Sequence, residues 1–228
     1  MKGALIEIEG NWAHFKKPET NNNPLTHDFI TKTALIGLIG AVLGVERKDM
    51  RPLFPQLSED TGYGVRIRNP VKKESWAFTL RGAVNLFEKA PKHMEFLKNP
   101  SFTVAIGLRN DRSEELFERF IQSVEKNETC YTPVLGLHNC PANLRLVSEG
   151  SFEARQGEFE TFAFVSNRHT IVVRKQFRIG FERIPTHQND DFWNDKYVEV
   201  VYPSENNSIS AKGEYHHYTA DKSAWFLV

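Results

Sequence analysis

Apolar and polar residues alternate in four stretches of the chain, and this alternation predicts four strands. The clearest stretch covers residues 101–108, where every second residue is large and apolar. The other three cover residues 4–9, 61–68 and 143–148. Because side chains along a strand point alternately to its two faces, each stretch is expected to place one face on a hydrophobic core.

Residues 31–44 predict a buried helix, because they are apolar on nearly every side. Gly37, Gly40 and Gly44 share one face of this helix. Each glycine in a helix interior costs roughly 1 kcal/mol relative to alanine, so a sheet or a backbone is expected to pack closely there. Pro52 and Pro55 are expected to interrupt the chain where it leaves the helix.

A second helix is predicted to begin at Asp111, with Glu114 three residues later forming a capping box. Apolar residues then recur at helical spacing, which places them on one face. This stripe consists of Leu116, Phe117, Phe120, Ile121 and Val124. We expect both helices to cover the same face of a sheet.

The order of these elements predicts an α+β fold. Strand, helix, strand, hairpin, strand, helix and strand follow one another, which is the βαββαβ order of ferredoxin-like domains, including the RNA-recognition motif. We expect this domain to span residues 1–150, with a hairpin thumb inserted at about 70–98. Residues 151–228 show strand-like runs and are expected to form a smaller antiparallel β extension, in which the polar segment 204–222 is a loop.

The composition excludes a strong global field. The 228 residues include 29 basic and 29 acidic ones, so any attraction for nucleic acid must come from local patches. Only two cysteines occur, Cys130 and Cys140, which fits a reducing compartment. The sequence shows no targeting segment and no apolar run of the length that spans a membrane, so a cytoplasmic protein without a membrane partner is expected.

Basic residues do cluster locally. Between Arg66 and Lys98 there are eight lysines and arginines against three acids, with Trp76 and Phe78 among them. A second basic cluster lies at 168–183. Cations that hold phosphates beside aromatic rings that stack on bases suit single-stranded nucleic acid. The alternative, charges that only solvate the outer faces of strands, stays open for each cluster.

Two local features are suited to close contact with a ligand. At the start of the first helix, unpaired backbone N–H groups beside Lys32 favour a phosphate, although an ordinary cap by Thr31 or Thr33 is the alternative. After the second helix, Pro133 and Gly136 predict a tight turn whose backbone could approach a ligand. A plain connection is the alternative there.

Signals for catalysis are poor. The sequence contains no phosphate-binding loop, no dinucleotide fingerprint and no nucleophile elbow, and no cysteine–histidine set completes a zinc site. No metal and no cofactor are therefore expected. A metal-independent ribonuclease needs only a histidine, tyrosine or lysine near a 2′-hydroxyl. His14, Lys17, Tyr63 and His138 are the residues that could supply one.

Two segments resemble the Cas-five family of CRISPR-associated proteins from type I surveillance complexes. The first is Phe15-Lys16-Lys17-Pro18-Glu19-Thr20-Asn21, followed by the apolar helix at 31–44. The second is Tyr131-Thr132-Pro133-Val134-Leu135-Gly136-Leu137. They occur in the order and strand–helix context typical of the family, over roughly residues 4–147, and are most similar to the type I-B branch.

This resemblance implies a non-catalytic subunit of the ribonucleoprotein Cascade, which serves antiviral defence. Such a subunit caps the 5′ handle of the CRISPR RNA, contacts the Cas-seven backbone subunit and the large Cas-eight subunit, and meets target DNA through the complex. Phosphate contacts would position the handle and base stacking would select it. The residues that the resemblance implies in RNA binding are Lys16, Lys17, Asn21, Thr31, Lys32, Thr33, Lys72, Lys73, Trp76, Arg81, Gly136 and Leu137. Arg66 from the first basic cluster and His138 after the glycine turn complete the candidates for RNA binding.

An enzyme is the alternative. The type I-C branch of the same family cuts precursor CRISPR RNA by metal-independent acid–base chemistry, whereas type I-B systems are expected to leave this step to a Cas-six nuclease. No catalytic residue is assigned here, because the chain's histidines, lysines and tyrosines are not matched to that branch's catalytic set. A free-standing RNA-recognition module is a third possibility, although Gly62-Tyr63-Gly64-Val65 matches its signature only in part and favours a glycine-bent strand.

Overall fold

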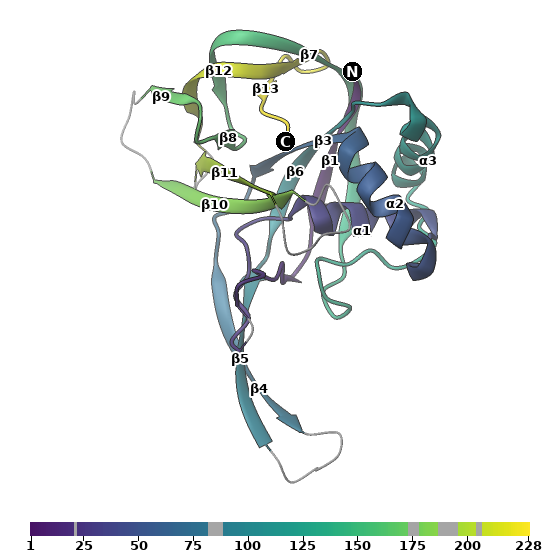
Figure 1. Cartoon of the computed structure of the whole chain (residues 1–228), viewed down its shortest axis with the longest axis vertical. Coiled ribbons are helices and arrows are strands. Elements are labelled where there is room, and N and C mark those ends of the chain that lie inside the picture. The colour runs from purple at the N-terminus through teal and green to yellow at the C-terminus, as the bar shows by residue number, and fades with distance from the viewer. Residues whose placement is uncertain (21, 82–88, 173–177, 187–195, 204–206) are drawn as a thin grey trace.

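The computed structural model describes residues 1–20, 22–81, 89–172, 178–186, 196–203 and 207–228 (Figure 1). These residues form a mixed α/β structure built on a curled antiparallel sheet, from which a long hairpin projects. In chain order the elements are β1 (Lys2–Glu9), β2 (Trp12–Ala13), α1 (Lys32–Leu43), α2 (Arg47–Asp60), β3 (Thr61–Ile67), β4 (Lys73–Arg81), β5 (Lys89–Lys98), β6 (Ser101–Leu108), the 3₁₀ turn η1 (Asp111–Ser113), α3 (Glu114–Glu125), β7 (Asn143–Thr161), β8 (Val165–Ser166), β9 (Thr170–Val172), β10 (Ile179–Thr186), β11 (Lys196–Pro203), β12 (Ile209–Tyr218) and β13 (Ala224–Trp225).

The main sheet has the strand order β13-β12-β7-β1-β6-β3, and each neighbouring pair along it is antiparallel. β1 lies in its middle and is buried on both faces, with Ile6 and Ile8 on one face and Leu5 on the other. Glu7 of the same strand is also buried, because the guanidinium groups of Arg68 and Arg145 contact its carboxylate. The first strand is therefore more deeply enclosed than its alternating pattern predicts.

A second sheet, in the order β10-β11-β8, continues the curl. Arg66 of β3 pairs with Ala163, and the N–H of Phe164 donates to the carbonyl of Val65 at 3.0 Å, so the chain entering β8 runs along the free edge of β3. Side chains of β10 and β11, including Ile184 and Val200, share one hydrophobic core with α1 and β1.

α1 confirms the predicted buried helix. The Thr31 side chain accepts a hydrogen bond from the N–H of Ala34 at 3.3 Å, and Gly44 ends the helix in the left-handed conformation with φ of 73°. The expected close partner for its glycines is absent at Gly37, where a Cβ would meet nothing within 4 Å. Gly40 instead faces the side chain of Met50 in α2, and Gly44 faces the side chain of Cys130. The expected sheet is therefore not what packs against these glycines.

α2 corrects the expectation that the chain is interrupted after α1. Pro52 and Pro55 lie inside this helix, although each removes one backbone donor. Met50, Leu53 and Phe54 pack against the main core, and this packing holds the helix together. The sequence of this segment did not predict a helix, because prolines ordinarily interrupt helices.

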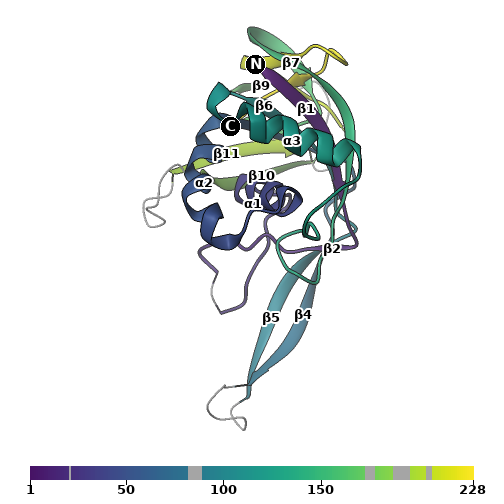
Figure 2. The same ribbon diagram turned by 90° about the vertical axis from the view of Figure 1, so that its right-hand side faces the viewer.

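α3 begins later than predicted. Asp111 opens a 3₁₀ turn, and its cap is Asn110, whose side chain accepts from the N–H of Arg112 at 3.1 Å. The predicted capping box between Asp111 and Glu114 is therefore wrong. The apolar stripe is confirmed: Phe117, Phe120, Ile121 and Val124 are buried and Leu116 packs beside them. Figure 2 shows α3 running alongside the main sheet on the side that also carries α1 and α2.

The hairpin predicted between residues 70 and 98 is formed by β4 and β5, and it projects away from the sheets (Figures 1 and 2). Its base is fixed by β2, which pairs with β5. Aromatic rings close the same junction, where Trp76 lies with its ring centroid 4.6 Å from that of Trp12 and 4.6 Å from that of Phe96. Part of the Trp76 ring therefore packs against other aromatic rings of the protein.

The C-terminal part contains more strand than predicted. β7 crosses residue 150 without a break and pairs with both β1 and β12, so the expected boundary falls inside one strand. The segment 204–222, predicted as a loop, contains β12. The chain then returns across the sheet, and Val228 exchanges two backbone hydrogen bonds with Tyr63.

Candidate nucleic-acid interface

The described residues of the segment 14–28 form a loop whose two arms are joined by a backbone hydrogen bond. Pro18 occupies the second position of a turn in which the N–H of Thr20 donates to the carbonyl of Lys17 at 3.1 Å. The N–H of Lys17 donates to the carbonyl of Leu25 at 2.9 Å, so the two arms of the loop are joined. Lys16 stands on the outside of this ladder and is exposed.

The turn at 133–137 lies directly against the start of this loop. The N–H of His14 donates to the carbonyl of Leu135 at 3.0 Å. Gly136 has φ of 89°, and a Cβ there would lie 2.0 Å from the carbonyl oxygen of His14, so only glycine fits. The two segments that carry the family resemblance are thus joined in space, although more than 100 residues separate them. Gly136 and His138 are exposed beside the loop, and Leu137 is half-buried.

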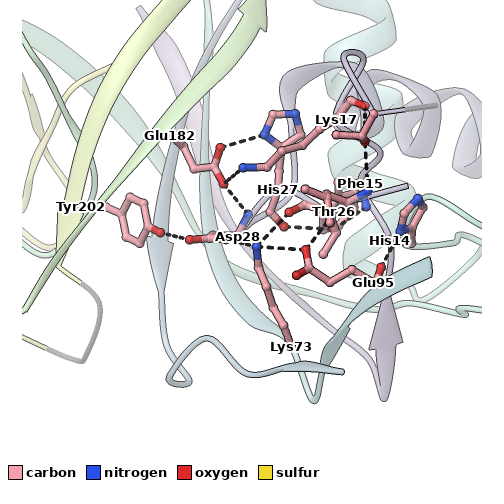
Figure 3. Close-up of polar contacts among 12 residues, drawn as sticks. His14, Phe15, Lys17, Thr26, His27, Asp28, Lys73, Glu95, Glu182 and Tyr202 are labelled. Atoms are coloured by element: carbon pink, nitrogen blue, oxygen red, sulfur yellow. Dashed lines mark hydrogen bonds and ion pairs between the residues drawn. The ribbon is translucent and has the colours of Figure 1, made fainter. Parts of the chain in front are cut away.

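Glu182 of β10 anchors the loop from the other side (Figure 3). Its carboxylate lies 2.9 Å from the Nζ atom of Lys17 and 3.0 Å from Nδ1 of His27, and it accepts from the N–H of Asp28 at 3.1 Å. Burial alone would raise the pKa of this carboxyl group, but the hydrogen bonds and charges of His27 and Lys17 outweigh it and lower the pKa to about 2.

A second set of ion pairs ties the loop to the hairpin base (Figure 3). The ammonium of Lys73 lies 2.6 Å from Oδ1 of Asp28 and 3.2 Å from Oε2 of Glu95. Burial opposes the charge of Lys73, but these two carboxylates outweigh it and raise its pKa. Asp28 also accepts from the hydroxyl of Tyr202, and Glu95 accepts from the N–H of Thr26 at 3.1 Å.

These contacts divide the predicted lysines into two kinds. Lys17 and Lys73 form ion pairs that join the loop to β10 and to the hairpin. Lys16 and Lys72 are exposed at the protein surface. Lys17 and Lys73 therefore contribute to the position of the loop and of the hairpin.

The start of α1 does not offer the predicted anion site. Thr31 is buried as the cap, and Lys32 is only 4% exposed, with its Nζ atom donating to the carbonyl of Val228 at 3.0 Å. Burial, helped by the nearby charge of Arg109, lowers the pKa of Lys32 to about 7. Thr33 is half-buried. The C-terminal segment covers this helix end, so Lys32 is unsuited to a phosphate contact in this conformation.

Arg66 and Arg81 belong to strands β3 and β4 rather than to the loop. The guanidinium of Arg66 stacks 4.4 Å above the centroid of the Phe162 ring. Arg81 ends strand β4, and its side chain lies outside the described residues, as does the whole of Asn21.

The candidate acid–base residues are differently exposed. Tyr63 is fully buried and its hydroxyl donates to the carbonyl of Ile30. This placement supports the glycine-bent strand over a stacking platform. His14 is buried, which lowers its pKa, and its Nδ1 lies 2.7 Å from the carbonyl of Glu95. His138 is exposed. Within the described residues no three His, Cys, Asp or Glu side chains come together to hold a metal ion.

Four residues that hold the loop at 14–28 in place were not among the residues predicted from the sequence. They are His27, Asp28, Glu95 and Glu182. Glu182 lies 155 positions from His27. It is the only acidic residue in the basic cluster at 168–183. An acid isolated in this way is a weak signal of an internal ion pair, because the pattern does not name its partner.

Comparison with known proteins decides the family. Residues 4–205 match the family described as CRISPR-associated protein (Cas_Cas5). The chain belongs to the Cas-five family. The matched residues include the loop, the turn and the hairpin, so the candidate interface lies within the matched region.

Individual relatives agree with this membership. The chain is 27% identical over 151 residues to the CRISPR system Cascade subunit CasD of Escherichia coli K12. This alignment covers 60% of this chain and 66% of that protein, just under two thirds of its length. The fold is similar to a CRISPR protein from Archaeoglobus fulgidus, with a TM-score of 0.60, 13% identity and coverage of 100% and 98% of the two chains. A chain of a CRISPR RNA-guided surveillance complex has a TM-score of 0.53 at 12% identity, covering 92% of this chain and 90% of that one. In the described residues no helix has the length and apolar character needed to cross a membrane.

Proposed function

We propose that this member of the Cas-five family is a Cascade subunit that holds the 5′ handle of the CRISPR RNA without cutting it. The observation that carries the proposal is the junction of residues 14–28 with the turn at 133–137, the two segments of the family resemblance. The similarity to a subunit named for Cascade supports the assembly.

The junction is suited to binding a defined strand because it is rigid. The ion pairs of Glu182 and Lys73 fix the loop on two sides, so little ordering is required when RNA binds. Lys16 and Lys72 supply exposed charge for phosphates, and His138 supplies an exposed ring beside the glycine turn. The hairpin of β4 and β5, with its aromatic base, projects from this junction (Figure 1).

Finer assignments belong to the same proposal. The order β7-β1-β6-β3, antiparallel throughout, supports a ferredoxin-like arrangement of these strands. Membership of the type I-B branch and contacts with Cas-seven and Cas-eight subunits are expected from the resemblance of the two segments. Target DNA is reached through the complex.

Binding is tested by charge reversal at a single exposed site. Lys16→Glu should weaken binding of a fluorescent handle RNA and reduce the slope of log affinity against log salt by roughly 1, because one phosphate contact is lost. Lys48→Glu is the matched control, since the ammonium of Lys48 is exposed on a different element, α2. If wild type and Lys16→Glu bind the handle RNA with equal affinity, the loop does not contact the RNA.

Absence of cutting is tested with labelled repeat RNA in EDTA. We expect the RNA to stay intact, since the Tyr63 hydroxyl and the His14 ring are buried away from the surface. Specific cutting at the handle boundary that is lost in His138→Ala would instead establish the enzyme, with the exposed histidine as its acid or base.

A further inference from the structure

A polar cleft opens on the opposite side of β10–β11 from the loop. It lies between the turn joining β8 to β9, the strands β10 and β11, and β12. Its volume is about 680 Å³, within the range of roughly 300–1,000 Å³ that small-molecule sites occupy. Successive side chains of a strand alternate, so Glu182 contacts the loop while its neighbour Arg183 lines the cleft.

One wall of the cleft is a stacked pair of planar groups. The guanidinium carbon of Arg183 lies 4.1 Å from the centroid of the Tyr197 ring. Arg183 is exposed, so the pair presents its outer surface to the cleft. Planar guanidinium and aromatic groups are the surfaces on which unpaired bases stack.

The floor of the cleft is fixed before any ligand arrives. His169 is buried, with its Nε2 atom 2.7 Å from the carbonyl oxygen of Glu214 and its Nδ1 atom 3.2 Å from that of Ser166. Gly213 allows this approach, because a Cβ there would lie 2.4 Å from the ring of His169. A fixed floor lowers the ordering cost of binding.

The charges of the cleft favour a base over a row of phosphates. Arg168 and Arg183 are offset by Glu199 and Glu214, so no excess positive charge attracts a polyanion. The amide of Asn167 donates to Oε2 of Glu199 at 2.7 Å, which holds that carboxylate at the cleft. A carboxylate accepts hydrogen bonds from amino groups on bases, as glutamate does from N4 of cytosine.

We propose that this cleft binds one unpaired nucleotide whose base carries an amino group. The base stacks on the Arg183–Tyr197 pair, Glu199 accepts from its amino group, and Arg168 takes its phosphate. This inference goes beyond capping of the handle, and it rests on the proposed function only in that an RNA strand is one source of the nucleotide. A free mononucleotide carries the same chemistry.

The test is titration of the folded ¹⁵N-labelled chain with AMP, CMP, GMP and UMP, followed by amide chemical shifts. We expect chemical-shift changes only at cleft residues. We also expect UMP to bind at least about fivefold more weakly than the other three nucleotides. Arg183→Lys keeps the charge but loses the plane, and it should weaken binding at least about fivefold, the lower bound for loss of one stacked base. Arg119→Gln, an exposed arginine on α3, should bind like wild type.

Several outcomes overturn the proposal. If no cleft amide shifts, the cleft is not a nucleotide site. If Arg183→Lys binds like wild type, the base does not stack on the Arg183–Tyr197 pair. If UMP binds as tightly as the other nucleotides, there is no contact with an amino group. Repeating the titration with single-stranded hexamers of A, C and U separates a strand from a free nucleotide as the source.

The two proposals fail separately. Lys16→Glu should leave the mononucleotide titration unchanged, because Lys16 lies outside the cleft. Failure of handle RNA to bind while cleft shifts persist would overturn the proposed function alone, and the reverse result would overturn the cleft alone.

Discussion

Replacing Glu182 by glutamine should loosen the loop at residues 14–28. The folded pKa of Glu182 is about 2, against an ordinary value of 4.5. At 1.36 kcal/mol per unit, this difference corresponds to roughly 3 kcal/mol of stability at neutral pH. Because the folded pKa is the lower one, this contribution is present above pH 4.5 and is lost as the pH falls towards 2. Glu182→Gln should therefore lower the free energy of unfolding by about 2–3 kcal/mol at pH 7.

The assay is urea-induced unfolding followed by circular dichroism at several pH values. The difference in free energy of unfolding between wild type and Glu182→Gln should narrow by about 1 kcal/mol or more between pH 5.5 and pH 3.5. Glu153→Gln, which removes an exposed carboxylate paired with Arg155, should leave the urea midpoint unchanged. A Glu182→Gln midpoint equal to wild type, or a gap independent of pH, would refute the claim that this carboxylate holds the loop.

Three further substitutions probe the interface and α1. Gly136→Ala should lower both the urea midpoint and handle affinity, because a Cβ would lie 2.0 Å from the His14 carbonyl; an unchanged midpoint would contradict the close contact. Gly37→Ala should stabilise the protein by about 0.5–1 kcal/mol in urea unfolding, since nothing lies within 4 Å of the new methyl group; a loss would show that this face is occupied. Lys32→Met should leave handle affinity unchanged in anisotropy titrations, because the side chain is buried. A tenfold loss of affinity would instead support a contact between Lys32 and the RNA at the start of α1.

The predictable part of the fold depended on local periodicity. The alternation at residues 101–108 and the stripe from Phe117 to Val124 gave β6 and the buried face of α3, because each pattern arises within one element. α2 was missed because Pro52 and Pro55 weaken the local pattern, and contacts with the rest of the core outweigh that weakness.

The candidate site was only partly predictable for the same reason. The turn at Gly136 and the exposed Lys16 could be found from sequence, since glycine and the Lys-Lys-Pro segment are local signals. The burial of Lys32 by Val228 and the pairing of Lys17 with Glu182 join residues far apart in the chain. Sequence spacing carries no information about such partners. Both lysines were therefore predicted to contact RNA from their charge alone.

Photo-crosslinking of the assembled ribonucleoprotein tests the central claim most directly. A photoreactive base is placed at successive positions of the 5′ handle, the complex is reconstituted with this chain, and crosslinked peptides are identified by mass spectrometry. We predict intact RNA with crosslinks to peptides containing residues 14–20 and 131–138. Crosslinks confined to α3, or a handle that contacts neither segment, would contradict the account.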